Sequence, residues 1–158
     1  IFQCGSEAGP RALGNRSILY DPTDPNGKDY VNRVKGREWY RPFAGTILQE
    51  YQDEYFDMKN LKESPFMMYA VNVKNDKLPA ITHVDKTCRI QTLTKEQNPH
   101  YYNLIEAFRK LTGVPVLFNT SLNLSGDCIN ETIEDALISL EKSKIDYLYL
   151  PEQQLLIN

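Results

Sequence analysis

The stretch "NPHYYNLIEAFRKLTGVPVLFNTSLNLSGD", residues 98 to 127, contains the signals of a helix, a strand and a polar loop in direct succession. Asn98 is a favourable N-cap, Pro99 suits the first helical position, and Gly113 suits the left-handed residue that ends a helix. The apolar run that follows, residues 114 to 119, has the length of a buried strand and ends in polar residues. The pattern therefore predicts a helix between the two caps that leads into a strand of a sheet.

A second helix is predicted over residues 132 to 144, where Thr132 and Asp135 have the spacing of a capping box. Apolar residues recur on both predicted helices at helical spacing, so each helix should bury one stripe. The expected stripe of the first helix is Leu104, Ile105, Phe108 and Leu111. The expected stripe of the second is Ile133, Ala136, Leu137 and Leu140.

Strand patterns occur on both sides of these helices. Strands are predicted at residues 65–73, 88–93, 146–150 and 154–158. Residues 88–93 alternate, which puts Arg89 on the opposite face from the apolar Ile90. The first 45 residues, rich in Gly, Pro, Asn and Arg, are expected to form loops, short helical turns and one short strand. The order of elements predicts an α+β or mixed α/β sheet with helices on at least one face.

Length and composition describe an ordinary globular domain. The chain has 158 residues, 41% of them hydrophobic and 25% charged, which suits one domain. It has no apolar run of the ~20 residues that a membrane helix needs, and its first residues lack a signal-peptide pattern. Three widely spaced cysteines without a CxxC pair suggest reduced thiols in a cytoplasmic protein and no metal site. Because the sequence lacks an initiator Met, we expect it to be a fragment of a longer protein.

Positive charge is concentrated in "RVKGREWYRPFAG", residues 33 to 45, although the net charge of the chain is -3. Its four cations are Arg33, Lys35, Arg37 and Arg41. A basic cluster on an acidic background suits a small anionic ligand better than nucleic acid. The loop at residues 119 to 127 offers hydroxyl and amide groups that could hold phosphate oxygens. Composition alone favours a solvated turn for the loop, and for the basic stretch it also fits a solvated surface with arginines stacked on aromatic rings.

Four ordered motifs resemble the C-terminal domain of the O-carbamoyltransferases of antibiotic and nodulation-factor biosynthesis. They are "GPRALGNRSIL" (9–19), "VKGREWYRPFAG" (34–45), "THVDKTCRIQTL" (82–93) and "PVLFNTSLNLSGD" (115–127). That domain is similar to the YrdC fold, whose K-x-R and S-x-N motifs match Lys35-Gly36-Arg37 and Ser121-Leu122-Asn123. The resemblance implies a single YrdC-like domain over residues 1–158, with a mixed twisted sheet, flanking helices and an open, basic, concave face.

The resemblance also implies a function, which is to form carbamoyl-adenylate from carbamoyl phosphate and ATP, with Mg²⁺. An N-terminal domain of actin-like, sugar-kinase-like fold, absent from this chain, would then transfer the carbamoyl group to a hydroxyl acceptor. The implied catalytic residues are Lys35, Arg41 and Arg89. The implied ligand-binding residues are Arg11, Lys35, Arg37, Arg41, Arg89, Ser121 and Asn123. Arrays of cations of this kind stabilise the charge that develops in phosphoryl transfer.

Two departures from the family pattern stand near these motifs. Gly45-Thr46 follows "FA" where the family commonly has Pro-Ser, and we expect Gly45 to loosen packing. Lys86 stands where Gly is usual, and we expect it to add charge near the site. His83 is expected to form structural hydrogen bonds, whereas Trp39 and Tyr40 either pack the loop or stack on adenine.

Two other functions are compatible with the sequence. One is threonylcarbamoyl-adenylate synthesis for tRNA modification, although the stand-alone synthases lack the "GPRALGNRS" motif. The other is a non-catalytic nucleotide- or RNA-binding module, which the net charge of -3 disfavours in the case of RNA.

Overall fold

The computed structural model describes residues 1–158 and contains a six-stranded sheet in the order β1-β6-β2-β5-β4-β3, beside a two-stranded sheet of β7 and β8. The strands are β1 (Ser17–Tyr20), β2 (Ala44–Leu48), β3 (Phe56–Asp57), β4 (Tyr69–Val73), β5 (Thr87–Leu93), β6 (Val116–Ser121), β7 (Leu148–Leu150) and β8 (Leu155–Ile157). The helices are α1 (Gly27–Lys35), α2 (Gln52–Tyr55), α3 (Pro99–Thr112) and α4 (Ile133–Lys142), with short 3₁₀ turns η1 (Gln49–Tyr51) and η2 (Pro151–Gln153). Only β2 and β5 run parallel, so the predicted mixed α/β sheet is confirmed.

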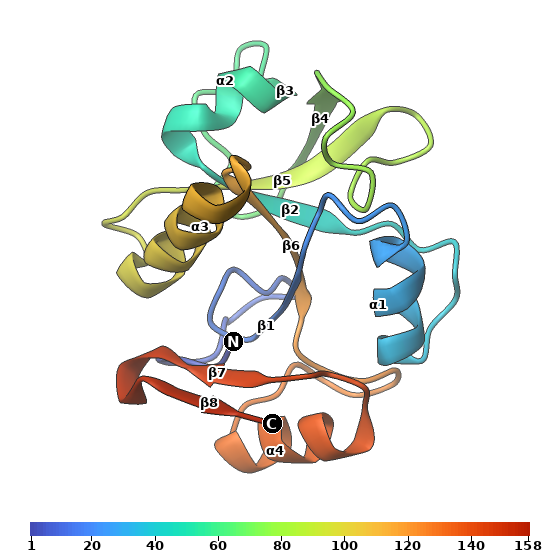
Figure 1. The fold of residues 1–158 in the computed structure, drawn as a ribbon, viewed down its shortest axis with the longest axis vertical. Helices are drawn as coiled ribbons and strands as arrows, with labels where there is room; N and C mark the ends of the chain where they lie inside the picture. The colour runs from blue at the N-terminus through green and yellow to red at the C-terminus, as the bar shows by residue number, and fades with distance from the viewer.

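Side chains alternate between the two faces of the large sheet and build a core on each. One core contains Ile47, Ile90 and Phe118 from the central strands together with Val31 of α1. The other face presents Leu48, Leu93 and Leu117, which pack with Tyr101 and Ile105 of α3. The view in Figure 1 shows α1 and α3 on opposite sides of β2 and β6. The sheet is therefore covered by one helix on each face, and the predicted alternation of residues 88–93 is confirmed.

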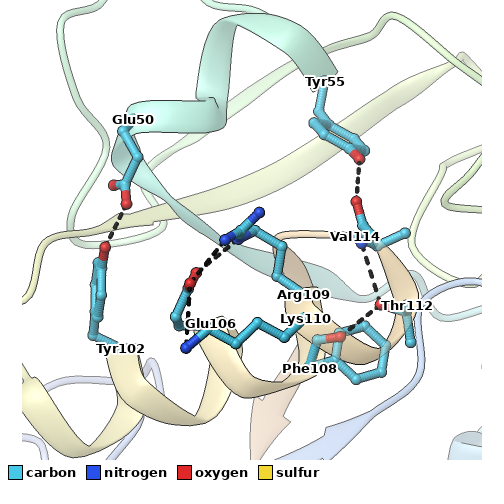
Figure 2. Close-up of polar contacts among 10 residues, drawn as sticks. Glu50, Tyr55, Tyr102, Glu106, Phe108, Arg109, Lys110, Thr112 and Val114 are labelled. Atoms are coloured by element: carbon cyan, nitrogen blue, oxygen red, sulfur yellow. Dashed lines mark hydrogen bonds and ion pairs between the residues drawn. The ribbon is translucent and has the colours of Figure 1, made fainter.

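Both predicted caps of α3 are present. The Asn98 side chain accepts a hydrogen bond from the Tyr101 amide at 3.0 Å, and Gly113 adopts the left-handed conformation with φ 79°. Figure 2 shows how the outer side of α3 is attached to the segment before β3, where the Tyr102 hydroxyl donates to Glu50. Leu111, which we expected to be buried, is 86% exposed. That expectation is wrong because α3 contacts the sheet through Tyr101 and Ile105 in its first half.

The helix α4 also begins as predicted. Thr132 and Asp135 form the reciprocal hydrogen bonds of the capping box, at 3.0 and 3.2 Å. Ala136 is fully buried, whereas Leu137 is 40% exposed, so its assignment to the buried stripe is wrong. The predicted strands near the C-terminus do form, but β7 and β8 pair with each other and stay outside the large sheet.

The sequence reasoning missed two elements that lie at the centre of the fold. Residues 27–35 form the helix α1, and residues 44–48 form β2, which lies between β5 and β6. The predicted strand at 65–73 begins only at Tyr69, because the chain turns at Met67, where φ is 53°. No helix combines the length and the apolarity that crossing a bilayer would require.

Gly45 lies in β2 at a point of close packing. A Cβ atom at this position would lie 2.5 Å from Ile81 Cδ1 and 3.3 Å from Val116 Cγ1. Both neighbours are buried, at 1% and 0% exposure. The expectation that Gly45 loosens packing is therefore wrong, because the neighbouring side chains already occupy the space beside it.

We predict that Gly45→Ala lowers the free energy of unfolding by about 1 kcal/mol, because the buried Ile81 must move to accommodate the methyl group. Urea denaturation followed by circular dichroism measures the change. Gly5→Ala is the matched control, since a Cβ there would meet nothing within 4 Å. Equal stabilities of the two variants would contradict the packing at Gly45.

Lys86 occupies a tight turn between residues 83 and 87 and has a left-handed backbone with φ 65°. A residue with a Cβ atom is strained in this conformation by roughly 1–2 kcal/mol, whereas glycine adopts it freely. We predict that Lys86→Gly raises the free energy of unfolding by about 0.5–1 kcal/mol after the entropic cost of glycine is subtracted. Lys86→Ala removes the charge but keeps the strain, so it should show no gain in the same denaturation assay. A gain of equal size in both variants would assign the effect to charge instead.

Candidate functional site

On the face of the sheet that packs against α3, the side chains next to the first residues of the chain are polar. Thr46, Gln91 and Asn119 come from β2, β5 and β6 and are all buried. The Thr46 hydroxyl donates to Gln91 Oε1 at 2.9 Å, and Asn119 Nδ2 donates to Thr46 Oγ1 at 3.0 Å. Asn119 Nδ2 also lies 3.3 Å from Gln91 Oε1. These three side chains, the polar trio, join the three central strands by hydrogen bonds within one face.

The polar trio also holds the opening segment of the chain against the sheet. Asn119 Nδ2 donates to the carbonyl oxygen of Ala12 at 3.2 Å, and Gln91 Nε2 donates to that of Leu13 at 2.9 Å. Glu7 closes the segment from outside, where its Oε1 accepts from the amides of Leu13 at 2.7 Å and Asn15 at 2.8 Å. Arg11 is consequently carried over the edge of the sheet by a segment with fixed backbone.

The basic stretch is positioned by Asn32, a buried residue of α1 that the sequence reasoning did not select. Its Nδ2 donates to the carbonyl oxygens of Trp39 at 3.1 Å and Arg41 at 3.2 Å. Its Oδ1 accepts from Arg37 Nε at 2.8 Å. The guanidinium carbon of Arg37 lies 4.1 Å from the centre of the Phe43 ring, a cation–π contact. One buried amide therefore sets both the path of the loop and the direction of Arg37.

Lys35 lies in the last turn of α1, and its ammonium group is surrounded by oxygen atoms of the loop after β6. It donates to the carbonyl and side-chain oxygens of Ser121, and to the carbonyl at 3.1 Å and Oδ1 at 2.8 Å of Asn123. Lys35 is 4% exposed, and no carboxylate accepts from it. Burial, with a smaller contribution from the charge of Arg37, lowers the pKa of Lys35 to about 7.

These segments meet around a small cavity of about 90 Å³, which we call the arginine pocket. Its lining includes Arg11, Arg37, Arg89 and Ser121, which were selected from the sequence, and Met67 and Asn119, which were not. None of the eleven lining residues is acidic. Burial lowers the pKa of Arg37 to about 10, and the charges of Arg41 and Arg89 contribute. Burial and the charge of Arg11 also lower the pKa of Arg89. The three cations repel one another, so the pocket is arranged for an anion.

The other residues selected from the sequence differ in their relation to the pocket. Lys35 and Asn123 are joined to it through hydrogen bonds with Ser121 but do not line it. Arg41 is not brought into the pocket, because its exposed side chain forms an ion pair with Glu38 at 2.7 Å. Arg41 nevertheless lies close enough to lower the pKa of Arg37, so its expected part in the site stays a prediction.

Residues flanking the basic stretch take other positions. His83 forms the structural hydrogen bonds that we expected, to Thr87 Oγ1 at 3.1 Å and to the carbonyl oxygen of Phe43 at 2.9 Å. Lys86 does not line the arginine pocket but a neighbouring cavity that it shares with His83, so the expectation that it adds charge near the site stays a prediction. Trp39 is 72% exposed, and within the loop its ring meets that of Tyr40 edge-on with 6.0 Å between the ring centres. Tyr40 lines a cavity of about 240 Å³ that shares Pro42 and Phe43 with the arginine pocket.

The largest cavity, about 400 Å³, lies elsewhere, between β1, α4 and the β7–β8 pair. Twelve of its thirteen lining residues are hydrophobic, and it gathers no cluster of charged side chains. The smaller arginine pocket therefore remains the candidate functional site, because charge and hydrogen-bonding groups converge there.

Comparison with known proteins relates this chain to several longer ones. It is 47% identical over 148 residues to nodulation protein NolNO of Sinorhizobium fredii, which covers 90% of this chain and 22% of that protein. It is 45% identical to nodulation protein NolO of Bradyrhizobium diazoefficiens, over 90% of this chain and 27% of that protein. It is 37% identical to nodulation protein U of Rhizobium tropici, over 94% of this chain and 26% of that protein. The chain thus spans only about a quarter of the length of these relatives.

Among solved structures, the crystal structure of full-length HypF in the phosphate- and nucleotide-bound form has a similar fold. The TM-score is 0.62 over 83% of this chain and 17% of HypF, at 20% sequence identity, so the likeness is one of fold. The fold expected for a YrdC-like domain, a mixed sheet with flanking helices, is confirmed. The family model described as the carbamoyltransferase C-terminus matches residues 1–156. The chain therefore belongs to the family of carbamoyltransferase C-terminal domains.

Proposed function

We propose that this domain binds carbamoyl phosphate in the arginine pocket and forms carbamoyl-adenylate with ATP. The observation that carries the proposal is the convergence of Arg11, Arg37 and Arg89 on one small cavity that no acidic side chain lines. These arginines come from three segments far apart in the sequence, and their mutual repulsion destabilises the fold unless an anion is bound. Arginine forks match the oxygen atoms of phosphate and carbamate groups.

The size of the pocket supports a small ligand. A cavity of about 90 Å³ lies well below the size of most small-molecule sites, so it suits one phosphate or carbamoyl group better than a whole nucleotide. The adjoining cavity of about 240 Å³, lined by Tyr40, Phe43 and His83, is where we place the nucleoside of ATP. Because Pro42 and Phe43 line both cavities, the α-phosphate of ATP would lie at their junction. HypF, which shares the fold, was crystallised with phosphate and nucleotide bound.

The proposed reaction has two bond-breaking steps. A water oxygen bonds to the phosphorus of carbamoyl phosphate, the bond between that phosphorus and the bridging oxygen breaks, and carbamate, inorganic phosphate and a proton result. A carbamate oxygen then bonds to the α-phosphorus of ATP, the bond between the α-phosphorus and the oxygen that bridges it to the β-phosphate breaks, and pyrophosphate leaves. Negative charge builds on the α-phosphate in this transition state, and fixed guanidinium groups stabilise it without reorganising. Arg89 and Arg37 are the residues that we assign to this role.

Lys35 and Asn123 are assigned as positioning residues. The Lys35 ammonium is occupied by the oxygens of Ser121 and Asn123, and so it fixes the loop that presents Ser121 to the pocket. The Ser121 hydroxyl donates to Asn123 Oδ1 at 2.6 Å, and its oxygen remains available as part of the pocket wall.

Mg²⁺ would enter this site with ATP. No group of three His, Cys, Asp or Glu side chains gathers in the structure, and the arginine pocket fits phosphate oxygens better than a divalent cation. The metal, when bound, would neutralise the charge of the nucleotide and would keep several of its water ligands. The residues of this chain would hold the phosphates and orient the reacting oxygen.

The remaining part of the proposal concerns the longer protein. We propose that an N-terminal domain of actin-like fold receives carbamoyl-adenylate and transfers the carbamoyl group to a hydroxyl acceptor in the cytoplasm. The relatives, of which this chain covers only 22% and 27%, have room for such a domain. The match to the carbamoyltransferase family favours this function over threonylcarbamoyl-adenylate synthesis.

We predict that Arg89→Ala lowers the rate of pyrophosphate release from ATP, with carbamoyl phosphate present, by about 10²–10³-fold, because one preorganised charge is lost. Arg89→Lys should also fail substantially, since a point charge cannot make a two-pronged contact. Where the domain alone does not release pyrophosphate, its affinity for carbamoyl phosphate is measured by calorimetry instead. Both Arg89→Ala and Arg89→Lys should then bind more weakly than the unmodified chain.

Arg33→Ala is the matched control for this experiment. Arg33 belongs to the same basic stretch but is exposed on α1 and lines no part of the arginine pocket. Its removal should leave both rate and affinity within about twofold, because a solvated charge is well screened. If Arg33→Ala and Arg89→Ala behave alike, the basic stretch acts only as a general positive surface and the site assignment fails.

A second prediction follows from the buried ammonium of Lys35. The unfolded chain keeps this proton up to a pH near 10.5, and the folded chain only up to about 7. The unfolded state therefore binds more protons between these values, and the free energy of unfolding rises with pH across this window. In Lys35→Met the rise should be weaker by up to about 1.4 kcal/mol per pH unit.

Urea denaturation at several pH values from 6.5 to 10 measures this difference between the two proteins. An anion in the arginine pocket favours the charged ammonium, so binding of carbamoyl phosphate near pH 7.5 should take up protons. Calorimetry in two buffers of different ionisation enthalpy detects the uptake, which should be absent in Lys35→Met. Parallel stability curves for the two proteins would show that Lys35 stays charged throughout.

A further inference from the structure

Two polar atoms that belong to residues of the arginine pocket are buried and have no hydrogen-bond partner. They are Asn119 Oδ1, an acceptor, and Arg89 Nε, a donor. Buried polar atoms are rarely left unpaired, because each loses its bonds to water without compensation. Because both residues line the same cavity, a single ligand that carries an acceptor and a donor group could satisfy both atoms.

The direction of the Asn119 amide is fixed by its other bonds. Its Nδ2 atom is committed to the Ala12 carbonyl, Thr46 Oγ1 and Gln91 Oε1, all of which are acceptors toward it. Thr46 donates its own proton to Gln91, so rotating the Asn119 amide would set oxygen against oxygen. Asn119 Oδ1 is consequently held on the side away from Thr46 and Gln91, as a fixed acceptor of a residue that lines the arginine pocket.

The register of the sheet brings Asn119 and Arg89 to the two sides of the same gap. Both are aligned with Ala44 of the strand between them, so they lie in one row and point to one face. Two strand spacings, roughly 10 Å, separate their Cα atoms. The only side chain between them in this row is the methyl group of Ala44, which leaves room for one small planar group.

We infer that Asn119 is the residue that selects a carbamoyl group over an acetyl group in the arginine pocket. The –NH₂ of the ligand donates to Asn119 Oδ1, its carbonyl oxygen accepts from Arg89 Nε, and its phosphate is bound by the guanidinium groups. This inference rests on the proposed function, because it identifies which acyl phosphate that site takes. A methyl group in place of –NH₂ leaves the buried oxygen of Asn119 unpaired, and an unpaired buried acceptor costs about 10- to 100-fold in affinity.

The test uses two stable ligands that differ only at this position. Phosphonoacetamide carries –NH₂ and 2-oxopropylphosphonate carries –CH₃, and both have the same phosphonate and carbonyl groups. Their dissociation constants for the 158-residue chain are measured by calorimetry, with inorganic phosphate as the reference anion. The unmodified chain should prefer the amide by about 10- to 100-fold.

Variants at position 119 show whether that preference comes from Asn119. Asn119→Ala should reduce the preference to within about threefold, and Asn119→Leu, which keeps the volume of the side chain, should do the same if the smaller residue unfolds the domain. Asn103→Ala, on the exposed side of α3, is the matched control and should keep the full preference. The ratio of two affinities for one protein is insensitive to a common loss of affinity in a variant.

The outcomes separate this inference from the function on which it rests. Equal binding of the two phosphonates by the unmodified chain would overturn the role of Asn119 and leave the anion site intact. An undiminished preference in a folded Asn119→Ala or Asn119→Leu protein would overturn it as well. Failure of both phosphonates and of phosphate to bind would instead refute the proposed function.

Discussion

The hydrogen bonds among Thr46, Gln91 and Asn119 are the constraint on which the rest of this structure depends. Each of these side chains is buried in the sheet, where an unpaired amide or hydroxyl group is costly. They bond to one another across β2, β5 and β6 and use their remaining donors to bind the backbone of the opening segment, so that only Asn119 Oδ1 has no partner. The backbone path of the first residues is therefore fixed by strands that come 30 to 110 positions later in the chain.

The site concentrates positive charge and restrains it with neutral groups. Asn32 holds Arg37 through an amide, and Lys35 is surrounded by carbonyl, hydroxyl and amide oxygens. An acidic partner would stabilise the empty protein more, but it would also compete with an anionic ligand for the same cations. Neutral oxygens orient the cations and leave their charge available. Burial, with a smaller contribution from the charge of Arg37, lowers the pKa of Lys35 to about 7 even though these oxygens accept its hydrogen bonds.

The direction of the strands explains why the site does not follow the rule for parallel sheets. Ligands of α/β proteins usually bind beyond the carboxyl ends of the strands. Here Ser121 lies at the carboxyl end of β6, but Arg89 and Ala44 lie near the amino ends of β5 and β2. Because β6 is antiparallel to β2, these ends meet at one edge of the sheet. The rule for parallel sheets therefore predicted a site at the loop of residues 119 to 127, but it did not predict that Arg89 would lie beside that loop.

The sequence alone determined the elements whose signals are local. The caps of α3 and α4 and the alternation of β5 depend on neighbouring residues, and all three were predicted correctly. Of the residues that the family motifs indicated, Arg11, Arg37, Arg89 and Ser121 line the arginine pocket. Only the tertiary structure decided the central position of β2 and the ion pair of Arg41 with Glu38. It also decided that Asn32 holds the basic loop and that Asn119 keeps one unpaired oxygen. These features depend on which strands become neighbours and which polar atoms they leave to be satisfied, and such pairings join residues too far apart for any local pattern to record.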